Sequence, residues 1–165
     1  MYKKILIVGP SGSGKTTLAR RIGKILKIES KSIDELRYSK DFLIKFSDKK
    51  AKNNLSRFLR RKRWILDGVY AREYIYPAFR KADIVIGLKA SRLKLIYRII
   101  KRDMKERKKY KNKPIKDFFK LLYWSQRYKY HNEIKHQELI KKFKKRAIYL
   151  KNNKEIESFI KAISN

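Results

Sequence analysis

The sequence contains no cysteine, few acidic residues and no long apolar run, and each absence narrows the possible functions. Without cysteine the chain has no disulfides, thiolate metal ligands or cysteine nucleophile, and nothing suggests an oxidising compartment. No apolar stretch approaches the ~20 residues that cross a bilayer. The apolar part of the opening MYKKILIVGP is too short for a signal peptide. We therefore expect a cytoplasmic protein with no membrane span.

The scarcity of acidic residues leaves a large excess of positive charge. The chain has 15 Asp and Glu against 47 Lys and Arg, a formal net charge of +32. Such a surface attracts polyanions. It could make nonspecific contact with nucleic acid or ribosomes, contact anionic lipid, or bind phosphorylated substrates. General lysine enrichment is the alternative, because the charge is spread along the chain. The two histidines, His131 and His136, lack metal-ligand spacing, and we expect both at the surface.

Apolar patterning predicts an α/β protein. At 165 residues, with 42% apolar side chains, we expect a single domain, residues 1–165, with one core. Continuous or short apolar runs predict strands at residues 3–8, 28–34, 64–68, 82–88 and 147–150. Helical spacing predicts helices between them, at about 15–27, near 55–59, from 93, from 118 and at the C-terminal end. This alternation implies a parallel five-stranded sheet with helices on both faces and ligands at the carboxyl ends of its strands.

One segment interrupts this pattern. Residues 101–113 are dominated by charge and precede Pro114, which disfavours helical geometry. We expect this segment to be mobile.

The strongest motif is GPSGSGKT, a full match to the Walker A phosphate-binding pattern between a predicted strand and a predicted helix. Its glycines allow backbone N–H groups to converge on phosphate oxygens at a helix N-terminus. Lys15 can reach the β- and γ-phosphates, and the Thr16 hydroxyl can bind Mg²⁺. An ordinary glycine-rich turn is the alternative. The predicted ATP-binding residues are Gly9, Ser11, Gly12, Ser13, Gly14, Lys15, Thr16 and Thr17.

Two aspartates follow predicted strands. Asp67, at the end of WILDG, is the candidate for holding Mg²⁺ together with Thr16; a turn-forming Asp before glycine is the alternative. Asp34 could face an acceptor hydroxyl or the metal, or it could instead cap a helix.

Arginines suit a transferred phosphoryl group because their planar fork of donors matches phosphate oxygens. Arg98 and Arg102 are four residues apart, on one face of a helix, and could close over bound phosphates. Two solvated surface cations are the alternative. Arg72 is a weaker candidate on the acceptor side.

Several segments, in order, resemble one family. GPSGSGKTTLARRIGKIL, SIDEL, RWILDGVYAR, ADIVIGLKASRLKLIYRIIKR and RAIYLKNNKEIESFI are similar to the small adenylate-kinase-like P-loop proteins labelled FlaR-related or DNA topology modulation proteins. The resemblance implies a three-layer P-loop NTPase fold of the nucleoside or nucleotide kinase type, with a basic helical lid at about 98–125. It also implies that WILDG corresponds to the adenylate-kinase strand that ends in Asp-Gly, and that RIIKR corresponds to the paired arginines at the base of the lid.

The sequence thus predicts an ATP- and Mg²⁺-dependent phosphotransferase with Lys15, Asp34, Asp67, Arg98 and Arg102 as catalytic residues. The acceptor is small, such as a nucleoside or nucleotide. A nucleotide-gated ATPase that binds nucleic acid or ribosomes is the alternative. The tyrosines of YWSQRYKYH could then stack on unpaired bases, although aromatic residues at helical spacing more often belong to a core.

Overall fold

A five-stranded parallel sheet forms the centre of the molecule. The computed structural model describes residues 2–39, 44–68, 73–109 and 115–164. The strand order is β2-β3-β1-β4-β5, which confirms the predicted parallel five-stranded sheet. The strands are β1 (Lys4–Val8), β2 (Ser30–Ser32), β3 (Trp64–Gly68), β4 (Ile84–Leu88) and β5 (Arg146–Leu150).

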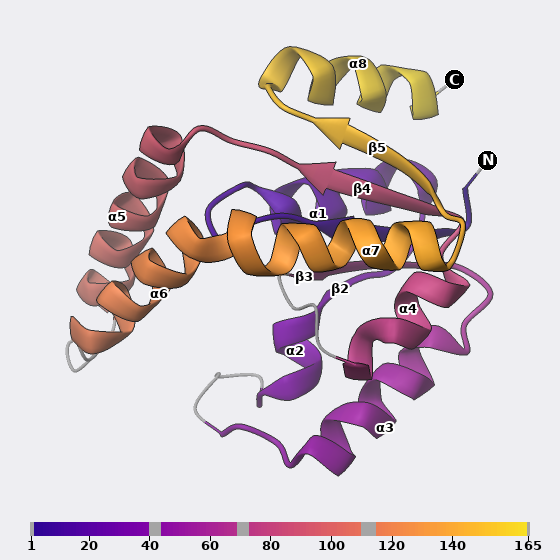
Figure 1. Cartoon of the computed structure of the whole chain (residues 1–165), viewed down its shortest axis with the longest axis horizontal. Coiled ribbons are helices and arrows are strands. Elements are labelled where there is room, and N and C mark those ends of the chain that lie inside the picture. The colour runs from indigo at the N-terminus through magenta and orange to yellow at the C-terminus, as the bar shows by residue number, and fades with distance from the viewer. Residues whose placement is uncertain (1, 40–43, 69–72, 110–114, 165) are drawn as a thin grey trace.

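Helices cover both faces of this sheet, as the apolar runs require. In β1, Ile5 and Ile7 point to one face, and Leu6 and Val8 to the other, because side chains alternate along a strand. Helices α1 (Lys15–Leu26) and α8 (Asn153–Ser164) pack on the first face. The second face is covered by α2 (Ile33–Arg37), α3 (Asp48–Leu59), α4 (Tyr76–Lys81) and α7 (Ile134–Lys142). The result is a three-layer arrangement (Figure 1).

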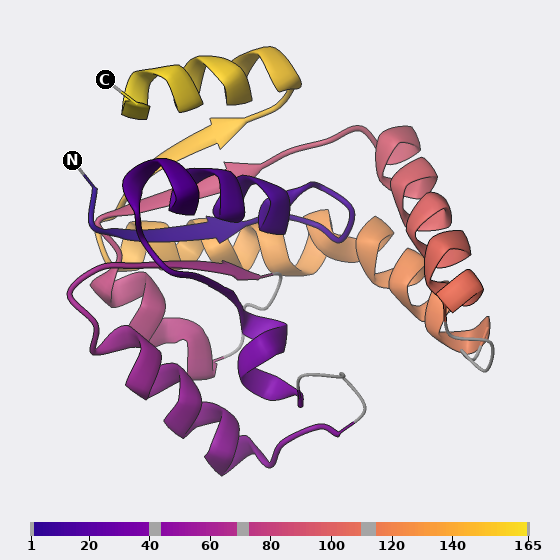
Figure 2. The ribbon, with the colours of Figure 1, turned by 180° about the vertical axis from the view of Figure 1, so that it is seen from behind.

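Two helices extend beyond the sheet. Helix α5 (Arg92–Lys109) follows β4, and α6 (Ile115–Tyr128) packs beside it. Both views show this pair, which we call the arm, projecting from the end of the molecule where β4 leads out of the sheet (Figures 1 and 2). One turn of π-helix, η2 (Lys129–Glu133), joins α6 to α7.

Some local predictions differ from the structure. Residues 101–109, the first part of the segment expected to be mobile, continue α5, because lysine and arginine are good helix formers; residues 110–113 lie outside the described residues. Strand β2 ends at Ser32, two residues before the predicted end, because the Ser32 hydroxyl caps α2 by accepting a hydrogen bond from the Asp34 backbone N–H. Asp34 is therefore not the cap. The short helices η1 (Glu73–Ile75) and α4 were not predicted.

The expectation that both histidines lie at the surface is wrong for His136. Its side chain is buried, and its Nδ1 lies 2.9 Å from the Tyr128 hydroxyl. The apolar residues around α7 exclude solvent here, and the tyrosine satisfies the ring nitrogen. His131 is exposed as expected. Within the described ranges, no helix combines the length and apolarity needed to span a bilayer.

Candidate functional site

The loop between β1 and α1 has the conformation that its glycines were expected to allow. Gly12 and Gly14 have φ angles of 80° and 95°, a region that residues with a Cβ rarely adopt. Gly14 precedes α1, and its carbonyl accepts the bond from Leu18 N–H at 2.9 Å, so the helix begins directly after the loop. The unpaired N–H groups of the first turn of α1 therefore face the same space as the loop.

Lys15, the first residue of α1, is buried at the bottom of this loop. Its Nζ donates a hydrogen bond to the Pro10 carbonyl at 2.9 Å. Burial lowers the pKa of Lys15 to about 8, although Asp67 and Asp34 favour its charged form. The ammonium group is thus held where it lacks full solvation, and an incoming phosphate would stabilise its charge.

Asp67 lies beside Lys15 because β3 pairs directly with β1. In this register Asp67 is opposite Ile7, and its buried carboxylate accepts a hydrogen bond from Thr16 Oγ1 at 3.1 Å. Burial raises the pKa of Asp67 to about 6, against the opposing effects of Lys15 and the Thr16 hydroxyl. The structure therefore brings together the two residues predicted to hold Mg²⁺.

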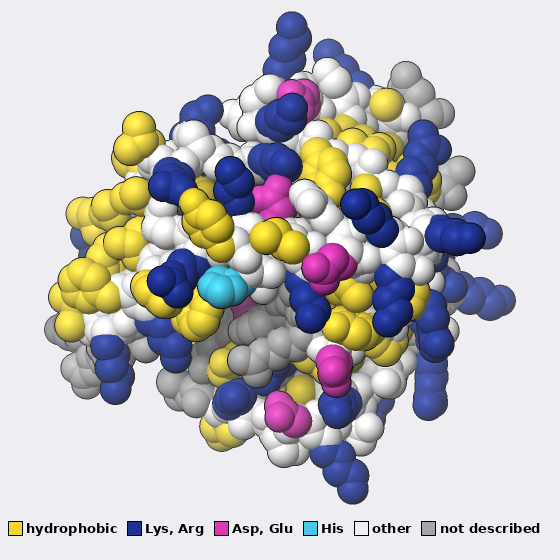
Figure 3. Space-filling view, in the orientation of Figure 1, with side chains coloured by type: hydrophobic (Ala, Val, Ile, Leu, Met, Phe, Trp, Pro, Cys, Tyr) yellow, Lys and Arg dark blue, Asp and Glu magenta, His cyan; other side chains and the backbone are white. Residues whose placement is uncertain are grey.

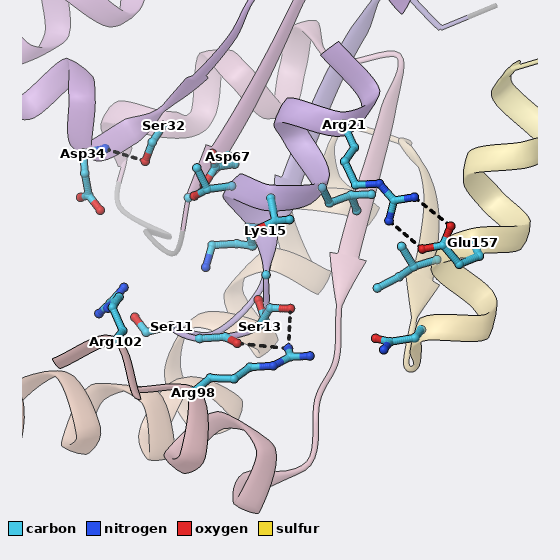
Figure 4. A pocket seen from close by; sticks show the side chains of 18 residues that line it. Ser11, Ser13, Lys15, Arg21, Ser32, Asp34, Asp67, Arg98, Arg102 and Glu157 are labelled. Atoms are coloured by element: carbon cyan, nitrogen blue, oxygen red, sulfur yellow. Dashed lines mark hydrogen bonds and ion pairs between the residues drawn. The ribbon is translucent and has the colours of Figure 1, made fainter. Parts of the chain in front are cut away.

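Asp34 reaches the same region from the neighbouring strand. Ser32 pairs with Asp67 in the β2–β3 register, and Asp34 follows two residues later in the first turn of α2. Figure 4 shows the Asp34 carboxylate on the opposite side of the pocket from α8. Asp34 thus borders the same cavity as the phosphate loop, on the side away from α8, where a second substrate could meet the nucleotide.

The two arginines of α5 approach the loop from the arm. Arg98 Nη1 donates to the carbonyls of Gly12 and Ser13, both at 3.3 Å. Arg102 lies one turn further along, where its charge lowers the pKa of Lys15 as the smallest of four influences. Both arginines border the pocket (Figure 4).

These residues line one cavity of about 610 Å³. Every predicted site residue borders it except Gly9, which lies behind the loop against Leu88. Arg72, the weaker candidate, lies outside the described residues. The lining residues are Ser11, Gly12, Ser13, Gly14, Lys15, Thr16, Thr17, Leu18, Arg21, Ser32, Asp34, Asp67, Gly68, Arg98, Arg102, Asn153, Ile156 and Glu157.

The side of the cavity formed by α8 was not predicted. Asn153 and Ile156 lie at the start of α8, and Glu157 makes a two-bond ion pair with Arg21 of α1 at 2.6 and 2.8 Å. The position of β5 was a usable signal, because its carboxyl end belongs to the same ligand-binding edge as those of the other strands. The ion pair joins two distant segments, and no local pattern in the sequence announced it.

The residues present fit a magnesium nucleotide. A hydroxyl and a carboxylate 3.1 Å apart offer the hard oxygen ligands that Mg²⁺ prefers, and Mg²⁺ usually completes its shell with water and substrate phosphates. No cluster of three or more His, Cys, Asp or Glu side chains that could hold a metal occurs in the described part of the chain. The buried Ser13 hydroxyl has no hydrogen-bond partner among the described residues, and a phosphate oxygen would supply one.

Solved structures with the same fold include small kinases. The chain resembles a shikimate kinase from Acinetobacter baumannii in complex with shikimate, with a TM-score of 0.63 and 19% identity over 98% of this chain and 90% of that one. It also resembles a gluconokinase from Sinorhizobium meliloti 1021, with a TM-score of 0.54 and 14% identity over 98% of this chain and 93% of the other. These similarities show a P-loop kinase fold.

Sequence comparison assigns the family. No curated protein matches the chain. Residues 5–118, more than half of the chain, match the family described as AAA domain. The narrower resemblance to FlaR-related proteins stays a prediction. With its phosphate loop, its five parallel strands and this match, the chain belongs to the AAA domain family of P-loop proteins.

Proposed function

We propose that the chain is an ATP-dependent kinase of the adenylate-kinase-like type that transfers the γ-phosphoryl group to a hydroxyl of a small acceptor. One observation carries this proposal: a carboxylate, Asp34, lies in the same cavity as the phosphate loop and the Thr16–Asp67 pair. An acceptor hydroxyl needs a group that orients it and accepts its proton, and Asp34 can serve in that role.

The phosphate end of the reaction depends on the loop, Lys15 and the arginines. Backbone N–H groups after Gly12 would hold the β- and γ-phosphates, while Lys15 compensates their charge. Arg98 bonds two loop carbonyls and holds the first half of α5 against the loop. Arg102 would then stabilise charge on the transferred group. Movement of the arm over bound nucleotide would make residues 98–125 the predicted lid.

Thr16 and Asp67 are the residues that would hold Mg²⁺. When bound, the metal neutralises charge on the phosphate oxygens. The Thr16 hydroxyl and the Asp67 carboxylate fix each other's orientation by their hydrogen bond, so the oxygens are already placed before a ligand enters. The raised pKa of Asp67 still leaves its carboxylate mostly ionised at pH 7.

Asp34 would orient the acceptor hydroxyl and take its proton during transfer. Ser32, beside it in the cavity wall, offers a further hydrogen-bonding group. The solved kinases of shikimate and gluconate support an acceptor of small size. A nucleoside or nucleotide is the acceptor class that the adenylate-kinase-like resemblance favours.

The test is transfer of phosphate from γ-labelled ATP to a panel of nucleosides, nucleoside monophosphates and small hydroxy acids. The phosphorylated products are identified by mass spectrometry. Lys15→Ala should abolish transfer. Asp34→Asn should abolish transfer while ATP affinity changes by no more than a few-fold, because Asp34 faces the acceptor. Glu35→Gln, which removes the exposed carboxylate next in the chain, is the matched control and should remain active.

Two results would contradict the proposal. Release of free phosphate without transfer to any member of the panel would make the chain an ATPase. Undiminished transfer by Asp34→Asn would remove this carboxylate from the reaction.

A further inference from the structure

The outer face of the arm carries aromatic side chains that nothing in the described structure covers. On α6, Phe119, Tyr123 and Trp124 are 59%, 50% and 48% exposed, and Tyr130 in η2 is 61% exposed. The opposite face of α6 is the packed one, where Ser125 is buried. Aromatic residues at helical spacing usually face a core. In the arm and η2, however, these four aromatic side chains face outward.

Basic side chains alternate with these aromatic rings. Lys116, Lys120 and Arg127 are exposed on the same helix, and the Arg127 guanidinium lies 4.9 Å from the centre of the Tyr123 ring. Residues 92–134 together contain 15 Lys and Arg against 4 Asp and Glu. The space-filling view shows apolar side chains gathered over the arm with basic ones among them (Figure 3). Stacking surfaces and positive charge therefore share one face.

A hollow lies between the start of α5 and the end of α6. It has a volume of about 440 Å³ and is lined by Arg92, Gln126, Arg127, Tyr130 and His131. Two guanidinium groups can bind phosphate oxygens, a tyrosine and a histidine ring can stack on a base, and a glutamine can bond to a base edge. This combination matches a nucleotide unit of a polymer.

We propose that this face of the arm binds single-stranded nucleic acid, with unpaired bases stacked on Tyr123, Trp124 and Tyr130 and the backbone phosphates held by Arg92 and Arg127. Stacking on aromatic side chains needs unpaired bases, which a duplex does not offer. The charge of the arm selects this occupant over a second copy of the chain, because two arms of equal charge repel each other. The proposal does not depend on phosphoryl transfer.

The tryptophans give a direct measurement. The chain has two, and Trp64 is fully buried, so Trp124 is the one a ligand can reach. Oligo(dT) and oligo(U) of about 20 nucleotides, added to the full chain, should quench the fluorescence of Trp124 by stacking. Trp124→Phe should abolish the quenching. The affinity, measured by the fluorescence anisotropy of a labelled strand, should be largely retained, because a phenyl ring also stacks on bases.

The aromatic and charge contributions can be separated. Tyr123→Ala combined with Trp124→Ala should weaken binding at least about tenfold. It should leave the slope of log affinity against log salt unchanged. The double variant Arg92→Gln with Arg127→Gln should reduce the magnitude of that negative slope by about 1.4, since each phosphate contact on a single strand contributes about 0.7. The control variant, Lys49→Gln with Lys52→Gln, removes the same charge from exposed residues of α3. It should reduce the magnitude of the slope by less.

Several results would overturn the proposal. Equal affinity for single-stranded and duplex DNA, equal competition by polyglutamate, or an aromatic variant that binds like the wild type would each leave only general attraction of polyanions. A dimer that depends on Tyr123 and Trp124 in sedimentation would identify a second copy as the occupant. Tighter binding of oligo(U) or of oligo(dT) would support the proposal and identify RNA or DNA as the preferred strand. Circular dichroism establishes that each variant is folded.

Discussion

Replacing Asp67 with asparagine should stabilise the ligand-free chain while removing its response to magnesium. The carboxylate is buried beside Thr16, and burial is the largest influence on its pKa. Asparagine has nearly the same shape, carries no charge and keeps an oxygen that can accept the Thr16 hydrogen bond. The substitution therefore removes the cost of a buried charge without creating a cavity.

The magnitude follows from the pKa. Burial raises the pKa of Asp67 from 3.8 to about 6, which corresponds to about 3 kcal/mol against the ionised folded state. This pKa already includes the attraction of Lys15 and the Thr16 hydrogen bond, both of which favour the ionised form. We expect a net stabilisation of up to about 3 kcal/mol at pH 7.5, or a rise in Tm of up to about 12 °C for a chain of this size.

The stability difference between the wild type and the Asp67→Asn variant should depend on pH. Between about pH 4 and pH 6, the folded wild-type chain keeps a proton on Asp67 that the unfolded chain has released. Its free energy of unfolding therefore falls as pH rises through this range, and the asparagine variant escapes that fall. The stability difference between the two proteins should be small near pH 4 and reach its full value above pH 6.

Thermal unfolding from pH 4 to pH 8, with and without ATP and Mg²⁺, measures both effects. Magnesium should increase the ATP-dependent rise in Tm of the wild type and leave that of the variant unchanged. A variant that melts below the wild type at pH 7.5, or a difference that does not change with pH, would refute the reasoning about the buried carboxylate.

Three further predictions concern the arm, the strand ends and the buried histidine. Arg102→Ala should slow single-turnover phosphate transfer at least about a hundredfold, whereas Lys108→Ala, an exposed lysine of α5 outside the cavity, should not; equal rates would remove Arg102 from the reaction. Gly68→Ala should cost about 1 to 3 kcal/mol in denaturant titrations and slow transfer, because its Cβ would overlap Ile33 at the start of α2. Gly87→Ala, in the same register on β4, meets the Tyr149 ring and should affect transfer less; the reverse order would contradict this account. Tyr128→Phe should lower stability by about 0.5 to 1.5 kcal/mol by removing its hydrogen bond to His136, while Tyr130→Phe at the surface should not; identical melting curves would show that the bond contributes nothing.

Much of the fold and of the nucleotide side of the site could be predicted because both depend on short-range patterns. The runs around Ile5 and Ile65 are apolar on both faces, which only central strands of a covered sheet require. The Walker A loop carries its conformation in its own glycines. Asp67 was found because it ends a strand that had to lie beside the loop.

The rest depends on contacts between distant segments. The pairing of Arg21 with Glu157 links residues 136 positions apart, and no period or motif encodes it. His136 looked like a surface residue because its neighbours in sequence, Lys135 and Gln137, are polar, but the fold brings Tyr128 to it. The exposure of Tyr123 and Trp124 likewise followed from the arm's position beyond the sheet, which helical spacing alone could not reveal.

The most direct test of the central claim is calorimetric titration of a nonhydrolysable ATP analogue in magnesium buffer into the wild-type chain and into Lys15→Ala. We predict one binding site in the wild type and a loss of at least about tenfold in affinity in the variant, because Lys15 supplies the cation nearest the phosphates. No detectable binding to the wild type, or equal affinities of the two proteins, would contradict the account.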